Sequence, residues 1–254
     1  MPASTTPSLH ALLLLSDTAL PLGSFAFSSG LESFLAHTKS QHTTSAAKSR
    51  AFDAFLEHSL ANVASTALPY VLAAYHDSSP LETLDNDFDA STPCTVARRA
   101  SVSQGRALLA IWERALCNSC PVDDHGSGAA AECLTKFAAA AKTSKADEYG
   151  LALNSHFPPL FGATCKALAI SEEDTAYLFL LNHAKALLSA AVRASVMGPY
   201  QSQTVLASSR LQKWIHDCID RERHKSVADA GVTVPVMDLW MGRHELLYSR
   251  IFNS

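Results

Sequence analysis

Two cysteines and a histidine form the pattern with the most obvious chemistry in this chain. Cys117 and Cys120 have C-x-x-C spacing, and His125 follows five residues later. Thiolate and imidazole groups bind soft divalent metals such as nickel or zinc, and C-x-x-C spacing can chelate one ion. A second pair of that kind would complete a closed site, but the sequence contains none. A metal site at these three residues and a set of ordinary loop cysteines are therefore both open.

Motifs for other catalytic chemistry are absent from the sequence. It contains neither of the glycine-rich phosphate-binding patterns, G-x-x-x-x-G-K-S/T and G-x-G-x-x-G, and neither H-E-x-x-H nor G-x-S-x-G. We therefore expect a protein that is not an enzyme and that does not hydrolyse a nucleotide by itself. Dispersed His and Asp residues leave a helical enzyme as a weaker alternative.

Composition narrows the classes of partner. The 254 residues carry 20 Lys and Arg against 24 Asp and Glu, a formal charge of -4, so there is no global basic field for nucleic acid or an anionic membrane. No uninterrupted apolar run approaches the ~18 residues of a membrane span. Six cysteines without a recognisable export signal suggest reduced thiols and a cytoplasmic location.

The elements that must position these residues are predicted to be helices. Apolar residues recur at intervals of three and four along most of the chain, and sustained alternation typical of strands is missing. We expect an all-α fold, a single-domain bundle of about eight to ten helices spanning 1–254. Residues 1–7 are expected to be disordered, and 77–93 and 117–130 to be surface insertions. Pro69 is expected to begin a new helix.

Turn residues interrupt the helices near the N-terminus. In TALPLGSFAFSSGLESFLAH, residues 18–37, Pro21 and Gly23 end a first helix that starts near Ser8, and Gly30 precedes a second helix that carries Glu32. This part of the chain is predicted to turn tightly between two helices.

The clearest helix start is at Ser171, where a hydroxyl N-cap precedes three acidic residues, and the helix is expected to run to Met197. Its polar side chains fall on one stripe, which could face water, a partner or an internal polar passage. The C-terminal tail is unusually apolar, and it either folds back or docks on another protein. The stripe comprises Asn182, Lys185, Ser189 and Arg193.

Five blocks of the sequence, taken together, resemble the family of the urease accessory protein UreF. They occur in the family's order from near residue 9 to the C-terminus. They are LLLLSDTALPLGSFAFSSGLESFLA, RRASVSQGRALLA, HFPPLFGATCKALAI, LLSAAVRASVMGPYQSQTVL and RHELLYSRIFNS.

The resemblance implies an all-helical, non-enzymatic adaptor for urease maturation. Proteins of this family dimerise and bind the accessory protein UreD, called UreH in some systems. That complex recruits the nickel-carrying GTPase UreG and delivers the metal to apo-urease. No resident cofactor is implied, although nickel could pass transiently through the complex.

Site residues are carried over only where this sequence matches the family's blocks. The resemblance assigns the tail to the UreD-binding end of the fold: Arg243, His244, Glu245, Tyr248, Arg250 and Phe252. It assigns a second set to the dimer or GTPase-facing region: Glu32, Arg193, Gly198, Gln201 and Gln203. The two segments near 77–93 and 117–130 are longer than the family pattern, and Asp17-Thr18 replaces a frequent Ser-Pro, so no function is transferred to them.

Overall fold

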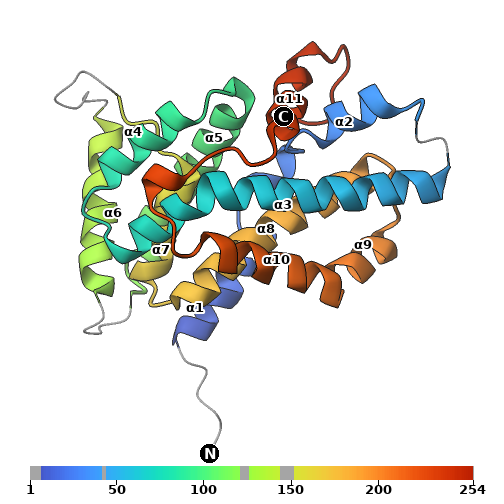
Figure 1. Cartoon of the computed structure of the whole chain (residues 1–254). Coiled ribbons are helices and arrows are strands. Elements are labelled where there is room, and N and C mark those ends of the chain that lie inside the picture. Colours follow the sequence, from blue (N-terminus) through green and yellow to red (C-terminus); the bar gives the residue numbers. More distant parts are fainter. Residues whose placement is uncertain (1–6, 42–43, 121–125, 144–151, 254) are drawn as a thin grey trace, which may run out of the picture.

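A 32-residue helix, α3 (Ser45–His76), runs through the centre of the computed structural model, which describes residues 7–41, 44–120, 126–143 and 152–253 (Figure 1). Thr44 caps it by accepting the N–H of Ala47. The predicted break at Pro69 is wrong, because the helix continues through this buried proline. Proline leaves the carbonyl four residues earlier without its helical donor, and that carbonyl, on Ser65, accepts the N–H of Gly231 at 3.1 Å.

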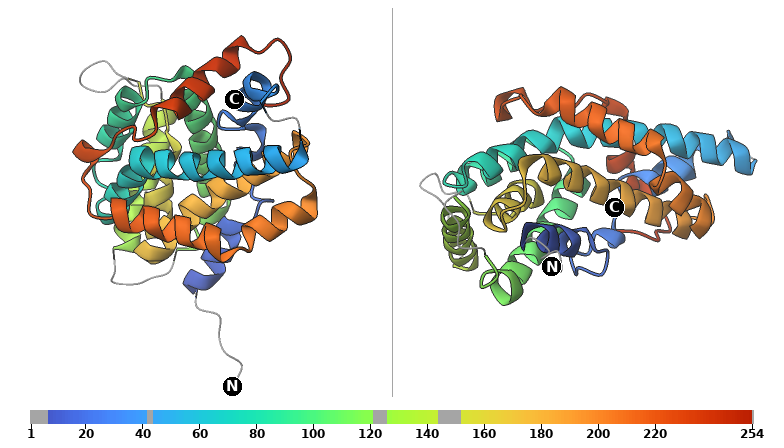
Figure 2. Two further views of the ribbon diagram at one scale, coloured as in Figure 1. Left: turned by 45° about the vertical axis from the view of Figure 1, so that its right-hand side comes forward. Right: turned by 90° about the horizontal axis from the view of Figure 1, so that it is seen from below.

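The core is a layered helical bundle, and the all-α prediction is confirmed. The helices α8 and α10 lie along α3, and α7 packs against one end of it (Figures 1 and 2). No β-strand occurs in the described ranges. Eleven α-helices are seen there, against the eight to ten expected. The bounds of these three partners of α3 are α7 (Phe157–Ala167), α8 (Glu172–Arg193) and α10 (Ser209–Glu222).

Two further groups of helices flank this centre (Figure 1). One group lies around α7, and the other carries both the N-terminal turn and the C-terminal tail. The first comprises α4 (Leu81–Ser91), α5 (Thr95–Ile111), which continues as a π-helical turn (Trp112–Leu116), and α6 (Ser127–Lys142). The second comprises α2 (Leu31–Thr38) and α11 (Pro235–Arg243), which pack on each other, and α1 (Pro7–Ser16) and α9 (Pro199–Leu206), which each pack on α8. The 3-10 turns lie at Ser24–Ala26, Val227–Asp229 and His244–Leu246.

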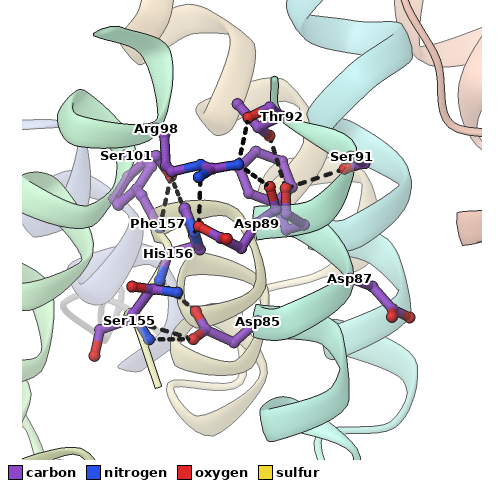
Figure 3. A network of polar contacts seen from close by, with 12 residues as sticks. Asp85, Asp87, Asp89, Ser91, Thr92, Arg98, Ser101, Ser155, His156 and Phe157 are labelled. Carbon is purple, nitrogen blue, oxygen red and sulfur yellow. Dashed lines mark hydrogen bonds and ion pairs between the residues drawn. The ribbon is translucent and has the colours of Figure 1, made fainter. Parts of the chain in front are cut away.

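The prediction of a surface insertion at 77–93 is wrong. Most of the segment is α4, whose apolar face is buried, and the fully buried Asp85 lies on the same face. The Asp85 carboxylate accepts the backbone N–H groups of Asn154, Ser155 and His156 at 2.7, 3.0 and 2.5 Å (Figure 3). An acidic residue in a segment with prolines suggested a solvated loop, but here it fixes the chain that leads into α7.

A polar cluster continues from Asp85 toward α5. The buried His156 ring lies 3.0 Å from Asp89 and 3.1 Å from the Ser101 hydroxyl, while Arg98 pairs with Asp89 at 3.2 Å (Figure 3). Gly105 allows the close approach, because a Cβ at this position would lie 1.9 Å from the Ser155 carbonyl oxygen. The neighbour that approaches Gly105 is thus the chain before α7.

The helix α8 begins as predicted and ends four residues early. The Ser171 hydroxyl accepts the Asp174 N–H at 3.1 Å, which confirms the N-cap. The helix stops at Arg193 because Ser195 adopts a left-handed φ of 57°, and α9 then begins at Pro199. Among the described helices, α8 alone is long and apolar enough for a membrane span by length and composition, and it lies mostly buried within the bundle.

Candidate partner-binding site

The N-terminal turn has backbone conformations that require small residues. After Pro21 the chain turns at Gly23, with φ of 72°, and turns again at Gly30, with φ of 84°. A Cβ on Gly30 would also lie 3.1 Å from both the Met241 backbone nitrogen and the Trp240 Cβ. Only glycine combines this φ with so close an approach, so Gly30 lets the start of α2 pack directly on α11.

The C-terminal tail is fastened to this turn through Glu32. In the first turn of α2, the Glu32 carboxylate accepts the N–H of Ile251 at 2.6 Å and the N–H of Phe252 at 3.2 Å. The backbone N–H of Asn253 donates to the Ala26 carbonyl at 2.8 Å. These three bonds hold the last described residues across the segment that joins α1 to α2.

His244 closes the tail on itself beneath this contact. Its fully buried ring donates from Nε2 to the Phe252 carbonyl at 3.2 Å, while Nδ1 has no hydrogen-bond partner and lies 3.7 Å from the Glu32 carboxylate. Burial lowers the pKa of His244, and the nearby Glu32 carboxylate partly opposes that shift. The ring therefore joins both ends of the tail loop in its neutral form.

An arginine on each side of Glu245 holds the outer part of the tail. Arg99, on α5, bonds the Glu245 carboxylate at 2.6 Å and the Asn253 carbonyl at 3.0 Å. Arg250 bonds the same carboxylate at 3.1 Å and the Glu245 carbonyl at 2.7 Å. The two guanidinium groups lower the pKa of Glu245, Arg99 having the larger effect.

Arg193, at the C-terminal end of α8, joins the tail to the N-terminal turn. Its guanidinium lies 4.3 Å from the centre of the buried Phe252 ring and donates to the Phe25 carbonyl. The rest of its stripe also faces the N-terminal segment, since Asn182 and Lys185 donate to the carbonyls of Leu15 and Ser16. The stripe therefore mainly binds the end of α1, and part of it lines a small cavity there.

The sequence left two alternatives for the apolar tail, and the structure contains elements of both. Phe252 and His244 fold back and are buried. Leu246, Tyr248 and Ile251 stay exposed by 75%, 106% and 65%. We call these three side chains the tail patch. A segment that is held to the fold by hydrogen bonds and presents three large apolar side chains to solvent is suited to contact another protein.

The structure brings together most, but not all, of the residues assigned from the sequence. Glu32, Arg193 and the tail residues form one site, with Tyr248 in its exposed patch. Arg243 lies just outside, over the Trp240 ring. Gly198, Gln201 and Gln203 are exposed around α9, where Gln201 donates to Ser49 of α3 rather than to the tail. Sequence reasoning missed the role of Arg99, although it lies in the RRASVSQGR block.

The cysteine pattern yields no metal site in the described residues. Cys117 and Cys120 donate to the carbonyls of Glu113 and Leu116, at 3.4 and 3.9 Å. Burial raises the pKa of Cys120, which disfavours the thiolate that a metal needs. His125 lies outside the described residues, and no group of three potential ligands gathers within them.

Comparison with known protein sequences identifies relatives of this chain. A sequence model of the UreF family matches residues 47–210. The chain is 37% identical to a UreF-like urease accessory protein of Schizosaccharomyces pombe, over 96% of this chain and 97% of that one. The chain belongs to the UreF family. It is also 28% identical to urease accessory protein F of Arabidopsis thaliana, over 94% of this chain and 89% of the relative, and 24% identical to UreF of Actinobacillus pleuropneumoniae, over 97% and 99%.

The candidate site lies partly outside the segment that the UreF family model matches. That segment includes Arg99 and Arg193 but neither Glu32 nor the tail. The full-length relatives named above extend over nearly the whole chain. We call the contacts of Glu32, His244, Arg99 and Arg193 that hold the tail to the N-terminal turn the clasp. The clasp thus joins the segment matched by the family model to the segments before and after it.

Proposed function

We propose that this protein acts in urease maturation as a non-enzymatic adaptor. In this proposal its tail binds the accessory protein UreD, or UreH, and the resulting complex recruits the GTPase UreG and passes nickel to apo-urease. Membership of a family of urease accessory proteins supports the role in urease maturation. The partners and the nickel transfer are our inference.

The observation that carries the proposal is the tail patch on its clasp. Leu246, Tyr248 and Ile251 are exposed while the backbone around them is held by Glu32, His244 and Arg99. Because the patch is ordered in advance, a partner that covers it loses little conformational freedom of this chain on binding. Large apolar side chains on a fixed backbone are typical of the central part of a protein interface.

The remaining parts of the proposal concern metal and self-association. Nickel is treated as cargo of the complex, with no resident ion on this chain. For the dimer or GTPase-facing surface we propose α9, where Gly198, Gln201 and Gln203 are exposed beside Tyr200, whose exposure is 89%. An exposed tyrosine with neighbouring amide groups can provide both apolar contact and hydrogen bonds.

The test combines genetic complementation with co-purification. A cell that lacks its own UreF protein should regain nickel-dependent urease activity when it expresses this chain, and the tagged chain should co-purify with UreD. A variant carrying Leu246→Asp and Ile251→Asp should lose both. The matched control is Leu13→Asp, because Leu13 on α1 is a 57% exposed leucine outside the tail patch. If the wild-type chain neither restores activity nor retains UreD, the proposal is wrong.

A further inference from the structure

The outer face of α5 carries a row of polar side chains beside the tail. Arg99, Ser103 and Arg106 are spaced by four and three residues, so they share one face of the helix, and all three are exposed. Two shallow hollows lie along this row. The second is lined by Arg99, Ser103 and the tail from Arg250 to Asn253. The first is lined by one face of α5: Thr95, Arg98, Arg99, Val102, Ser103 and Arg106.

The two hollows adjoin, because Arg99 and Ser103 line both of them. We call the pair the arginine groove. It begins on α5 near Thr95 and ends against the tail at Ile251, one of the three residues of the tail patch. The groove therefore meets the tail patch at Ile251.

The groove is positively charged in a protein whose formal charge is -4. Four arginines line it, and its described lining contains no carboxylate. Asp89 pairs with Arg98, and Glu245 pairs with both Arg99 and Arg250. Arg106 forms no ion pair among the described residues. Two carboxylates thus oppose four guanidinium groups, and the excess positive charge is centred on Arg106.

This small excess of positive charge is better suited to bind another protein than to bind a polyanion such as nucleic acid or an anionic membrane. Nucleic acid and anionic membranes are held by many cationic side chains at once, whereas three of these four arginines already bond carboxylates of the chain. The exposed Ile251 at the end of the groove offers an apolar contact that a phosphate backbone does not use. The structure favours an occupant with few carboxylates and an apolar side chain beside them.

We propose that the arginine groove receives an acidic segment of the same accessory protein that covers the tail patch. A carboxylate of that segment pairs with Arg106, and an apolar neighbour packs against Ile251. This inference rests on the proposed function for the partner, and it adds the charge of the partner's surface and the role of α5. Attraction between the groove and the acidic segment speeds association and fixes the orientation of the partner.

The experiment is a binding measurement with purified UreD-type partner at two salt concentrations. Arg106→Glu reverses the charge without removing a bond that holds the tail, and Arg106→Lys keeps the charge. Arg114→Glu is the matched control, since Arg114 is an exposed arginine on the continuation of the same helix and lies outside both hollows. Circular dichroism and thermal unfolding should show that all three variants fold.

We expect Arg106→Glu to weaken binding by about five- to tenfold at ~0.1 M salt, mainly through slower association, with Arg106→Lys within about twofold of wild type. The loss of affinity in Arg106→Glu should be smaller at ~1 M salt, because the Debye length is ~3 Å there and ~10 Å at ~0.1 M salt. Equal effects of Arg106→Glu and Arg114→Glu would overturn the inference. So would loss of self-association in Arg106→Glu, which would make a second copy the occupant. If the wild-type chain does not bind the partner at all, the failure lies with the proposed function.

Discussion

Glu32 should control whether the tail stays closed. The N–H groups of Ile251 and Phe252 donate to different oxygens of its carboxylate. Replacing Glu32 with glutamine therefore removes the charge and one of the two acceptors, and replacing it with alanine removes both. Hydrogen bonds to charged groups contribute about 1.5–3 kcal/mol each when buried, and the partial exposure of this side chain, 11%, reduces that value. We therefore expect Glu32→Gln to lower the free energy that holds the tail closed by about 1–2 kcal/mol.

Amide hydrogen exchange measures this change directly. Local opening exposes both amides, so a loss of 1–2 kcal/mol corresponds to about 5- to 30-fold faster exchange at Ile251 and Phe252. Exchange at these two amides should be faster in Glu32→Ala than in Glu32→Gln. Amides in the middle of α3 should be unaffected. Glu82→Gln, on the exposed side of α4, serves as the control. Unchanged exchange of the two tail amides in Glu32→Ala would refute the assignment of Glu32 as the fastening residue.

Three further predictions concern the fold. Asp85→Ala should lower the free energy of unfolding by about 3–5 kcal/mol in urea titrations, because three N–H groups, two of them on buried residues, lose their acceptor, whereas exposed Asp87→Ala should cost less than about 0.5 kcal/mol. His183 lies on α8, with its ring 2.8 Å from the Ser59 hydroxyl of α3. Burial lowers its pKa to about 4, so the unfolded chain binds the proton first and stability falls as the pH drops from about 6.5 toward 4. Wild type should therefore lose about 1–2 kcal/mol more than His183→Gln between about pH 6.5 and 5, and equal losses would contradict this. Gly30→Ala should cost about 2 kcal/mol in thermal unfolding through its φ and its contact with α11, while Gly128→Ala, with no atom near its Cβ, should cost nothing or stabilise.

Local signals in the sequence were sufficient for much of the fold. Three- and four-residue periodicity identified the long helices, and Ser171 and Gly30 marked helix starts through cap chemistry and backbone freedom. These features depend on residues within a few positions of one another. The resemblance to the UreF family added the order of the blocks and directed attention to Glu32 and the tail.

The wrong predictions involve contacts between distant parts of the chain. Pro69 stays within α3 because the carbonyl that it leaves free, on Ser65, bonds Gly231. The acidic segment around Asp85 is a helix with a buried face, and the Asp85 carboxylate on that face bonds backbone groups about 70 residues away. Neither partner is visible from local composition, and without it the rules for proline and for charged residues favour a break and a loop.

The candidate site was predictable in its members but not in its geometry. Glu32 and the tail blocks were found by resemblance, whereas their direct contact joins positions about 220 residues apart. Arg99 had only its place in a family block as a signal. The division of the tail into a buried part and an exposed patch follows from tertiary packing alone.

The central claim is that the clasped tail presents the partner-binding surface, and the affinity of the purified chain for purified UreD-type protein tests it most directly. The comparison is between wild type, the tail-patch variant with Leu246→Asp and Ile251→Asp, and the α1 control Leu13→Asp. We expect the tail-patch variant to bind at least about 100-fold more weakly, as for loss of central apolar contacts, with its thermal unfolding and the affinity of the control unchanged. Wild-type affinity in the tail-patch variant would contradict the claim.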